Sequence, residues 1–166
     1  TLQGKLAGKA RTFLGIPYAK PPVGALRFAP PEPAEKWQGV KPALQHGASC
    51  PQNPGALSAQ GPQSEDCLSL NVATPSADDG GRPVLVWIHG GGFQTGSGSI
   101  PWYHGTALAR RADVVVVSIN YRLGALGFSQ LAGTSVGDDR PGSGNLGLVW
   151  FTGDRPMADR VRLVGA

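Results

Sequence analysis

Two short apolar runs stand out in the hydrophobic pattern of the chain. Residues 83–88 are almost all apolar, and residues 113–120 contain a run of consecutive valines, which is typical of strands buried on both faces of a sheet. Residues 105–112, which lie between these runs, have the composition of a short helix with Thr106 as its expected N-cap. Strand, helix and strand in this order predict a βαβ crossover, and therefore a parallel pair of strands.

Weaker strand patterns flank this unit. Residues 1–18 alternate short apolar stretches with Gly and Lys, and they predict two or three short antiparallel strands. Residues 68–74 have a further strand pattern, and a short strand is expected near 39–44, within a Pro-rich loop that fills most of 19–66. The fold class predicted from these elements is α/β, with a mixed sheet whose centre is parallel.

Helices are scarce in relation to these strands. Residues 105–112 give a helical pattern, and residues 156–162 give only a weak one. Strands as apolar as these need helices on both faces of their sheet. The sequence therefore predicts a single, incomplete domain.

Composition narrows the class of protein. A chain of 166 residues is one domain or part of one, and 40% hydrophobic residues indicate a globular fold. The net charge of +4 comes from scattered arginines without a basic stripe, so we expect a solvated surface rather than nucleic-acid binding. No apolar run reaches the roughly 18 residues of a membrane span. The first residues have no signal-peptide pattern, and the start at Thr1 predicts a processed, trimmed or fragmentary chain.

The cysteines and histidines leave two interpretations open. Cys50 and Cys67 form either a disulfide or a pair of buried thiols. A disulfide would favour a secreted or periplasmic location over a cytoplasmic one. The three histidines, His46, His89 and His104, stand apart from both cysteines, so no metal site is predicted. We expect His46 and His104, which lie in loop-like segments, to be solvated.

A glycine-rich motif follows the first apolar run directly. His89, Gly90, Gly91 and Gly92 stand where a buried strand would end. An isolated glycine triplet is most simply a turn, but HGGG behind a strand is typical of an oxyanion loop. The backbone N–H groups of such a loop stabilise the negative charge that develops in ester hydrolysis.

A nucleophilic serine to accompany this loop is not predicted. The one formal Gly-x-Ser-x-Gly match is centred on Ser135. A nucleophile elbow needs a buried strand before the serine and a helix after it. Residues 128–132 form a weak strand pattern, and residues 138–142 contain Pro and Gly that oppose a helix start. We therefore do not assign Ser135 as the nucleophile.

Several motifs, taken together and in order, resemble the N-terminal third of a type-B carboxylesterase, the family of cholinesterases and bacterial para-nitrobenzyl esterases. The resemblance covers roughly residues 3–148, whereas residues 149–166 diverge as an internally deleted or unrelated tail. The motifs are Phe13–Ala19, Pro21–Gly24, Arg27–Phe28, Ser64–Leu68, Leu70–Val72, Val86–Phe93, Asn120–Gly124 and Gly144–Leu148.

The resemblance implies an α/β-hydrolase fold and a Ser–Glu/Asp–His triad that hydrolyses small ester substrates without a cofactor. It implies that the N–H groups of Gly91 and Gly92 are oxyanion donors, and that His89 and Gly90 support the loop. The family's catalytic histidine comes later in the chain than any residue present here. The resemblance therefore predicts a chain that carries the oxyanion loop but is inactive alone.

The resemblance also implies three structural contacts. It pairs Cys50 with Cys67 as a disulfide, and Arg27 with Glu65 as an ion pair. Arg122 would ordinarily pair with an acidic residue that is missing here, so it must contact Asp154, reach solvent or destabilise the chain.

Three interpretations of function stay open at this point. The first is a fragment of a serine carboxylic-ester hydrolase that acts through an acyl-enzyme. The second is a non-catalytic, cholinesterase-like binding module. The third is a truncated gene product without activity.

Overall fold

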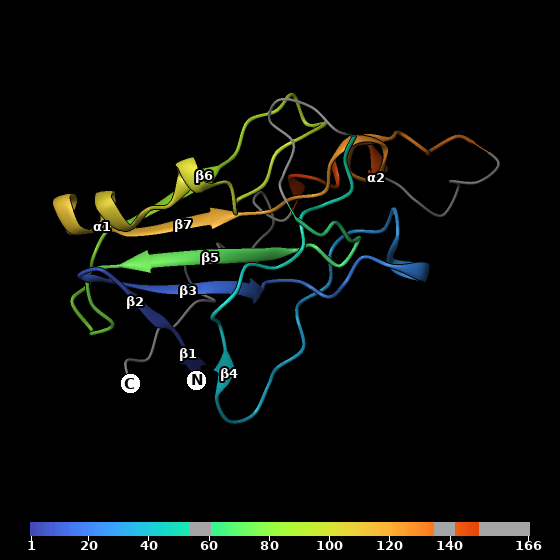
Figure 1. Cartoon of the computed structure of the whole chain (residues 1–166). Helices are drawn as coiled ribbons and strands as arrows, with labels where there is room; N and C mark the ends of the chain where they lie inside the picture. Colours follow the sequence, from blue (N-terminus) through green and yellow to red (C-terminus); the bar gives the residue numbers. More distant parts are fainter. Residues whose placement is uncertain (54–60, 135–141, 150–166) are drawn as a thin grey trace.

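A computed structural model describes residues 1–53, 61–134 and 142–149. Its centre is a five-stranded sheet, whose strands are labelled in Figure 1. Three of its neighbouring pairs are antiparallel, and the pair β7–β6 is parallel. A separate two-stranded pair lies beside it. In spatial order the sheet contains β2 (Lys5–Ala7), β3 (Ala10–Pro17), β5 (Ser69–Thr74), β7 (Val115–Ile119) and β6 (Val84–Ile88), and the separate pair consists of β1 (Leu2–Gln3) and β4 (Lys41–Pro42).

The βαβ unit and the mixed sheet are confirmed, with two corrections. Strands β6 and β7 are parallel and are joined through helix α1 (Thr106–Ala112). Within the described residues, however, this parallel pair lies at the edge of the sheet rather than at its centre, because β6 has no second neighbour. Strand β1 is also not antiparallel to its partner, since it pairs in parallel with β4.

The N-cap residue of α1 is not the one predicted from the sequence. Gly105 is the N-cap, and no side chain caps the helix, so the prediction of Thr106 as N-cap is wrong. A Cβ at residue 105 would collide with the side chain of Val116. The chain thus needs glycine here to bring the helix start close to β7, and this requirement outweighs the preference for a capping side chain.

The remaining helices are short. Helix α2 covers Gly124–Phe128, and the 3₁₀ turns η1, η2 and η3 cover Gly24–Leu26, Pro101–Tyr103 and Ser143–Asn145. The weak helical pattern at 156–162 lies outside the described residues. None of the helices that the structure describes is long and apolar enough to cross a membrane.

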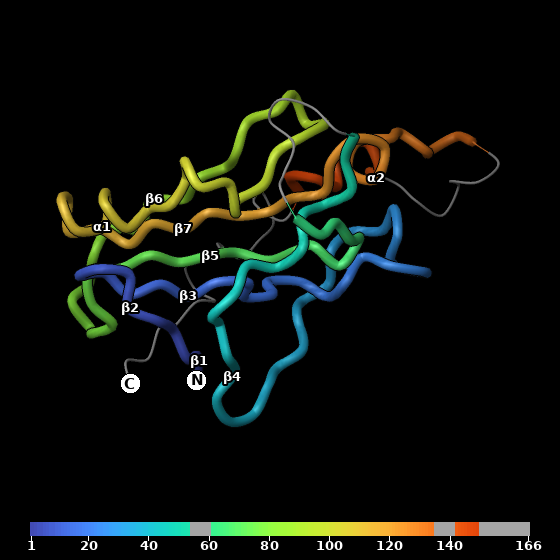
Figure 2. The backbone as a smooth tube through the Cα atoms, in the orientation of Figure 1, coloured from blue at the N-terminus to red at the C-terminus, as the bar shows by residue number. Residues whose placement is uncertain are grey.

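The hydrophobic core lies along β3, β5 and β7, which run side by side in the backbone trace of Figure 2. Helix α1 packs over the same three strands. A second cluster surrounds the two cysteines and includes Tyr121 and Leu123, which follow the end of β7 in the sequence. The most deeply buried side chains of these two clusters are Leu70, Val72, Ile119, Tyr121, Leu123, Cys50 and Cys67.

Strand β6 is apolar but exposed. Its five side chains are 40–52% exposed, whereas β7, which has a similar composition, is largely buried. The prediction that residues 83–88 are buried on both faces is therefore wrong within the described residues. The physical reason is the position of β6 at the sheet edge, where neither a strand nor a helix from the described part of the chain covers it. This exposure agrees with the expectation of an incomplete domain.

Candidate functional site

The glycine-rich loop begins where β6 ends and folds back on itself. The carbonyl oxygen of Gly91 accepts hydrogen bonds from the N–H groups of Gln94 (3.1 Å) and Thr95 (3.2 Å). Gly91 has a φ of +126°, and a Cβ at this position would collide with the carbonyl of Thr95. Only glycine can therefore close this turn.

Two backbone donors of the loop are available. Among the residues that the structure describes, the N–H groups of Gly91 and Gly92 donate to no protein acceptor. Gly92 is exposed and has a φ of +60°. Two neighbouring N–H groups without protein partners, held on a tight turn, are suited to binding an oxygen that carries negative charge.

His89 lies behind these donors and is 3% exposed. Its ring stacks on Tyr121 with centroids 4.4 Å apart, and its Nδ1–H donates to the carbonyl oxygen of Gly90 at 2.9 Å. The hydroxyl of Tyr121 donates to the carbonyl oxygen of His89 at 3.0 Å. Burial lowers the pKa of His89 below its usual value. The neutral imidazole is thus engaged in packing and in holding the loop.

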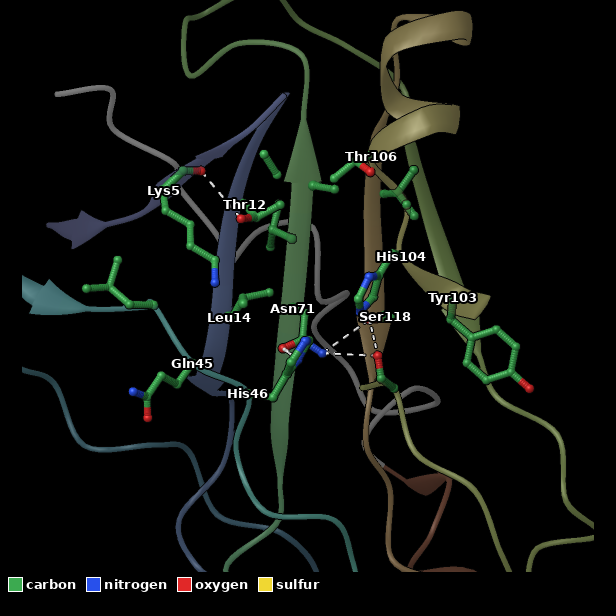
Figure 3. A pocket seen from close by; sticks show the side chains of 17 residues that line it. Lys5, Thr12, Leu14, Gln45, His46, Asn71, Tyr103, His104, Thr106 and Ser118 are labelled. Atoms are coloured by element: carbon green, nitrogen blue, oxygen red, sulfur yellow. Dashed lines mark hydrogen bonds between the residues drawn. The ribbon is translucent and has the colours of Figure 1, made fainter. Parts of the chain in front are cut away.

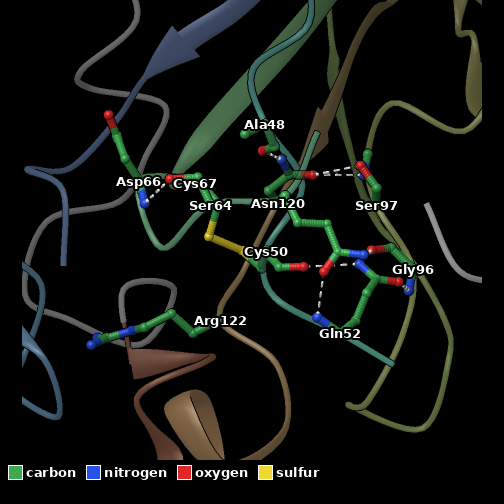
Figure 4. The surroundings of a disulfide bond; sticks show 12 residues. Ala48, Cys50, Gln52, Ser64, Asp66, Cys67, Gly96, Ser97, Asn120 and Arg122 are labelled. Atoms are coloured by element: carbon green, nitrogen blue, oxygen red, sulfur yellow. Dashed lines mark hydrogen bonds between the residues drawn. A yellow bond between two sulfur atoms is a disulfide. The ribbon is translucent and has the colours of Figure 1, made fainter. Parts of the chain in front are cut away.

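The other end of the loop is held by a side-chain amide (Figure 4). The Oε1 atom of Gln52 accepts the N–H of Gly96 at 2.8 Å, and its Nε2 donates to the carbonyl oxygen of Gly96 at 2.8 Å. The same Nε2 donates to the carbonyl oxygen of Cys50 at 3.0 Å. Gln52 therefore pairs with both backbone groups of Gly96, as a neighbouring strand would.

A second amide, Asn120, fixes the same region from the end of β7. Its Oδ1 accepts the N–H of Gly98 at 2.8 Å and the hydroxyl of Ser97 at 3.1 Å. Its Nδ2 donates to the carbonyl oxygen of Ala48 at 3.0 Å. The hydroxyl of Tyr18 donates to the backbone oxygen of Asn120 at 2.6 Å. Residues 96–98 are thus bound to the segment that carries Cys50.

Two of the three contacts implied by the family resemblance are present. Cys50 and Cys67 form a disulfide, with an S–S distance of 2.06 Å. Arg27 donates to both carboxylate oxygens of Glu65, at 2.6 Å from Nε and 2.5 Å from Nη2. This bidentate ion pair connects the Pro-rich N-terminal loop to the segment that leads into β5.

Arg122 is 4% exposed and binds backbone carbonyls. Its Nη1 donates to Ala29 at 2.9 Å and its Nη2 to Leu146 at 3.3 Å, whereas Nε has no partner within the described residues. Burial lowers the pKa of Arg122 below its usual value. Asp154, the acidic partner considered from the sequence, lies outside the described residues, as does Ser135.

A cavity of about 570 Å³ lies beside the start of α1 (Figure 3), and none of residues 89–92 lines it. His46 lines it, stacks on His104 at 5.7 Å between centroids, and donates from Nδ1 to Oδ1 of Asn71 at 2.9 Å. His46 is half-buried, so the expectation that it is solvated is wrong, whereas His104 is exposed. In the described ranges, no group of three or more His, Cys, Asp or Glu side chains could hold a metal ion.

Several supporting residues were not identified from the sequence. Asn71 and Asn120 interrupt apolar strand patterns, and a polar amide in such a place is a signal for a buried hydrogen-bond network. Tyr121 directly follows one of these asparagines and gave no separate signal. Gln52 lies in a polar loop, where the sequence contains no sign of its pairing with Gly96.

Comparison with known proteins identifies relatives along almost the whole chain. Residues 1–150 match the model of the carboxylesterase family. The chain is 46% identical to phenmedipham hydrolase of Pseudarthrobacter oxydans, over 99% of this chain and 33% of that protein. It is 45% identical to para-nitrobenzyl esterase of Bacillus subtilis, over 90% of this chain and 31% of that protein.

The same similarity holds at the level of structure. A crystal structure of a Geobacillus stearothermophilus carboxylesterase at pH 6.2 superposes with a TM-score of 0.84 and 44% identity. The match covers 99% of this chain and 33% of that one. The chain thus spans about a third of the length of these relatives.

Proposed function

The chain belongs to the carboxylesterase family, and from this premise we propose that it is the oxyanion-loop portion of a carboxylic-ester hydrolase. In this reaction a nucleophilic serine attacks the ester carbonyl, and the carbonyl oxygen becomes negatively charged in the tetrahedral intermediate. The residues assigned here act on that oxygen. Gly91 and Gly92 donate their N–H groups to it, and His89 and Gly90 support the loop.

One observation carries this proposal. The N–H groups of Gly91 and Gly92 have no acceptor among the described residues, although the loop around them is fixed by hydrogen bonds. Donors that are positioned before the charge develops cost no reorganisation during the reaction, which makes them effective in catalysis. A binding module without catalysis would have no need for such donors.

The chemistry of the whole enzyme extends beyond this chain. We assign the triad to parts of the domain that are not among the described residues, and small carboxylic esters are the proposed substrates. The 166-residue chain is accordingly inactive on its own in this proposal. The mechanism needs side chains and backbone dipoles only, so no cofactor is assigned.

The proposed location is outside the cytoplasm. The Cys50–Cys67 disulfide is compatible with an extracellular environment, since such bonds persist where conditions are oxidising. We therefore assign the protein to a secreted or periplasmic compartment.

A chimera tests the assignment of the loop. Residues 1–148 would replace the aligned segment of para-nitrobenzyl esterase of Bacillus subtilis. We expect turnover of p-nitrophenyl esters, and a fall in kcat of about 10²–10³-fold in Gly91→Ala, the usual effect of disturbing an oxyanion hole. Gly8→Ala is the control, because Gly8 also has a positive φ but lies in open space far from the loop in sequence.

Two outcomes would contradict the proposal. The first is a chimera that unfolds cooperatively but has no esterase activity. The second is a Gly91→Ala chimera as active as the Gly8→Ala control. Turnover by the 166-residue chain itself would overturn the assignment of inactivity, and Ser135→Ala would then test that serine as the nucleophile.

A further inference from the structure

The rear of the glycine loop is fixed at one residue, Gly96. Its φ of +114° is a conformation that favours glycine, and a Cβ at this position would collide with Nδ1 of His89. The backbone of Gly96 therefore lies directly against the imidazole that begins the loop. Any displacement of Gly96 changes the space that His89 occupies.

Gly96 is also coupled to the front of the loop. Residue 95 precedes it, and the N–H of Thr95 donates to the carbonyl oxygen of Gly91 at 3.2 Å. The same carbonyl accepts the side-chain hydroxyl of Thr95 at 3.4 Å. Because a Cβ at Gly91 or at Gly96 would collide with neighbouring atoms, this turn has little room to adjust. The position of Gly96 thus determines how Gly91 presents its N–H.

The side chain that holds Gly96 comes from a distant part of the sequence. Gln52 is 44 residues away and makes two hydrogen bonds of 2.8 Å to the backbone of Gly96, one as donor and one as acceptor. Figure 4 shows this pairing beside the disulfide. A third bond, from Nε2 of Gln52 to Cys50, fixes the rotamer of the side chain itself.

We propose that Gln52 is a positioning residue of the oxyanion loop, because its amide, paired with Gly96, sets the conformation in which Gly91 and Gly92 present their N–H groups. This inference rests on the proposed function of the loop. Gln52 itself does not contact the reacting atoms. Its action on them passes through the backbone of Gly96 and the packing against His89.

The hydrogen bonds between Gln52 and Gly96 can be tested by substitutions that remove the donor alone or both the donor and the acceptor. Pairing with Gly96 needs one donor and one acceptor on the same planar group. A glutamate at position 52 is isosteric but has no donor when ionised, and its charge faces two carbonyl oxygens. When protonated it regains one O–H donor, so Gln52→Glu restores the pairing at low pH. Gln52→Met has a side chain of similar length and restores it at no pH.

The experiment uses the ¹⁵N-labelled 166-residue chain and NMR of its backbone amides. At pH 7 we expect Gln52→Met to reduce the exchange protection of the Gly96 amide about tenfold relative to wild type, since that N–H loses its side-chain acceptor. Gln52→Glu still offers this N–H an acceptor, but when ionised it repels the carbonyl oxygens of Gly96 and Cys50 and should displace the Gly96 amide resonance. The resonances of Gly91 and Gly92 should shift with it. Towards pH 4, near the ordinary glutamate pKa of about 4.3, only Gln52→Glu should return to the wild-type spectrum recorded at the same pH.

Gln38→Glu is the matched control. It introduces the same charge at an exposed position, and it should leave the amides of Gly91, Gly92 and Gly96 unchanged at both pH values. The proposal is overturned if Gln52→Met changes Gly96 but leaves Gly91 and Gly92 at their wild-type positions. It is equally overturned if Gln52→Glu and Gln52→Met have the same pH profile.

Kinetics of the chimera distinguish a failure of the positioning proposal from a failure of the proposed function. In the chimera, Gln52→Met should lower kcat and leave KM nearly unchanged, because the donors act on the transition state. Shifted Gly91 and Gly92 amides together with an unchanged kcat would confirm the positioning role of Gln52 and contradict the assignment of the two glycines as oxyanion donors.

Discussion

Tyr121 holds His89 by two interactions at once: its hydroxyl donates to the carbonyl oxygen of His89 at 3.0 Å, and the two rings stack at 4.4 Å between centroids. The pair joins the start of the glycine loop to the chain that follows β7. Burial raises the pKa of Tyr121 above its usual value, so the hydroxyl keeps its proton at neutral pH. The support of the loop is therefore already assembled within this third of the family's length.

We expect Tyr121→Phe to lower the free energy of unfolding by about 1–2 kcal/mol. The substitution leaves the stacking in place but deprives a buried carbonyl of its donor. Urea unfolding measures the change. Tyr103→Phe is the control, with an expected effect below about 0.5 kcal/mol, since the Tyr103 hydroxyl has no protein partner among the described residues. Equal losses in both variants would contradict the importance of the hydrogen bond.

Removal of the disulfide should destabilise the chain substantially. The double substitution of Cys50 and Cys67 by alanine opens a loop of the size for which the chain-entropy model gives about 3 kcal/mol. Thermal unfolding should show a lower Tm for this variant, and a reductant should lower the Tm of the wild type only. A wild-type Tm that is insensitive to reductant would be inconsistent with the Cys50–Cys67 bond.

The exposed strand β6 should cause self-association of the isolated chain. An uncovered apolar edge strand offers unpaired backbone groups and apolar surface to other copies. We expect Val86→Lys to shift the sedimentation profile towards monomer. Val23→Lys, at a loop valine that is 45% exposed compared with 42% for Val86, should have little effect. A wild type that stays monomeric at all concentrations would rule out this prediction.

Stability should rise with pH through the range around the ordinary histidine pKa of about 6.5, because one buried and one half-buried histidine resist protonation in the folded chain. Burial lowers the pKa of His46 and of His89 below the ordinary value of 6.5, and for His46 the charges of His104 and Lys5 add to this effect. The unfolded chain therefore binds more protons than the folded one in this range, and stability is lost as the pH falls through it. His46→Gln retains a donor for Asn71 and should flatten the pH profile of unfolding free energy. A profile as steep as that of the wild type would contradict the assigned pKa shift.

The comparison of β6 with β7 shows how far the sequence could predict the fold. Both strands have the same apolar pattern, and the pattern correctly predicts two parallel strands joined by α1. Burial, however, depends on the neighbours of a strand, and periodicity carries no information about an absent neighbour. Among the described residues, strand β7 lies between two strands and packs against helix α1, whereas β6 has one neighbour.

The candidate loop could be predicted in part. HGGG behind a strand is a local signature of an oxyanion loop, and the family resemblance then selected Gly91 and Gly92 as its expected donors. The side chains that hold the loop have no such signature, because Gln52 and Asn120 reach it across 44 and 22 residues of chain. The Cys50–Cys67 bond was one of two interpretations until the family resemblance favoured it.

The contacts of Asn120 also determine when the loop can take shape. This one residue binds Ala48, which is 72 residues away, and accepts a bond from Tyr18 across 102 residues. Closing such long stretches of chain has an entropic cost that must be met before these contacts can stabilise the fold. The formation of the Asn120 contacts is therefore a slow step of folding. During synthesis the glycine loop is complete once Gly96 has been added. The frame that gives the loop its conformation is complete only after Asn120 has left the ribosome.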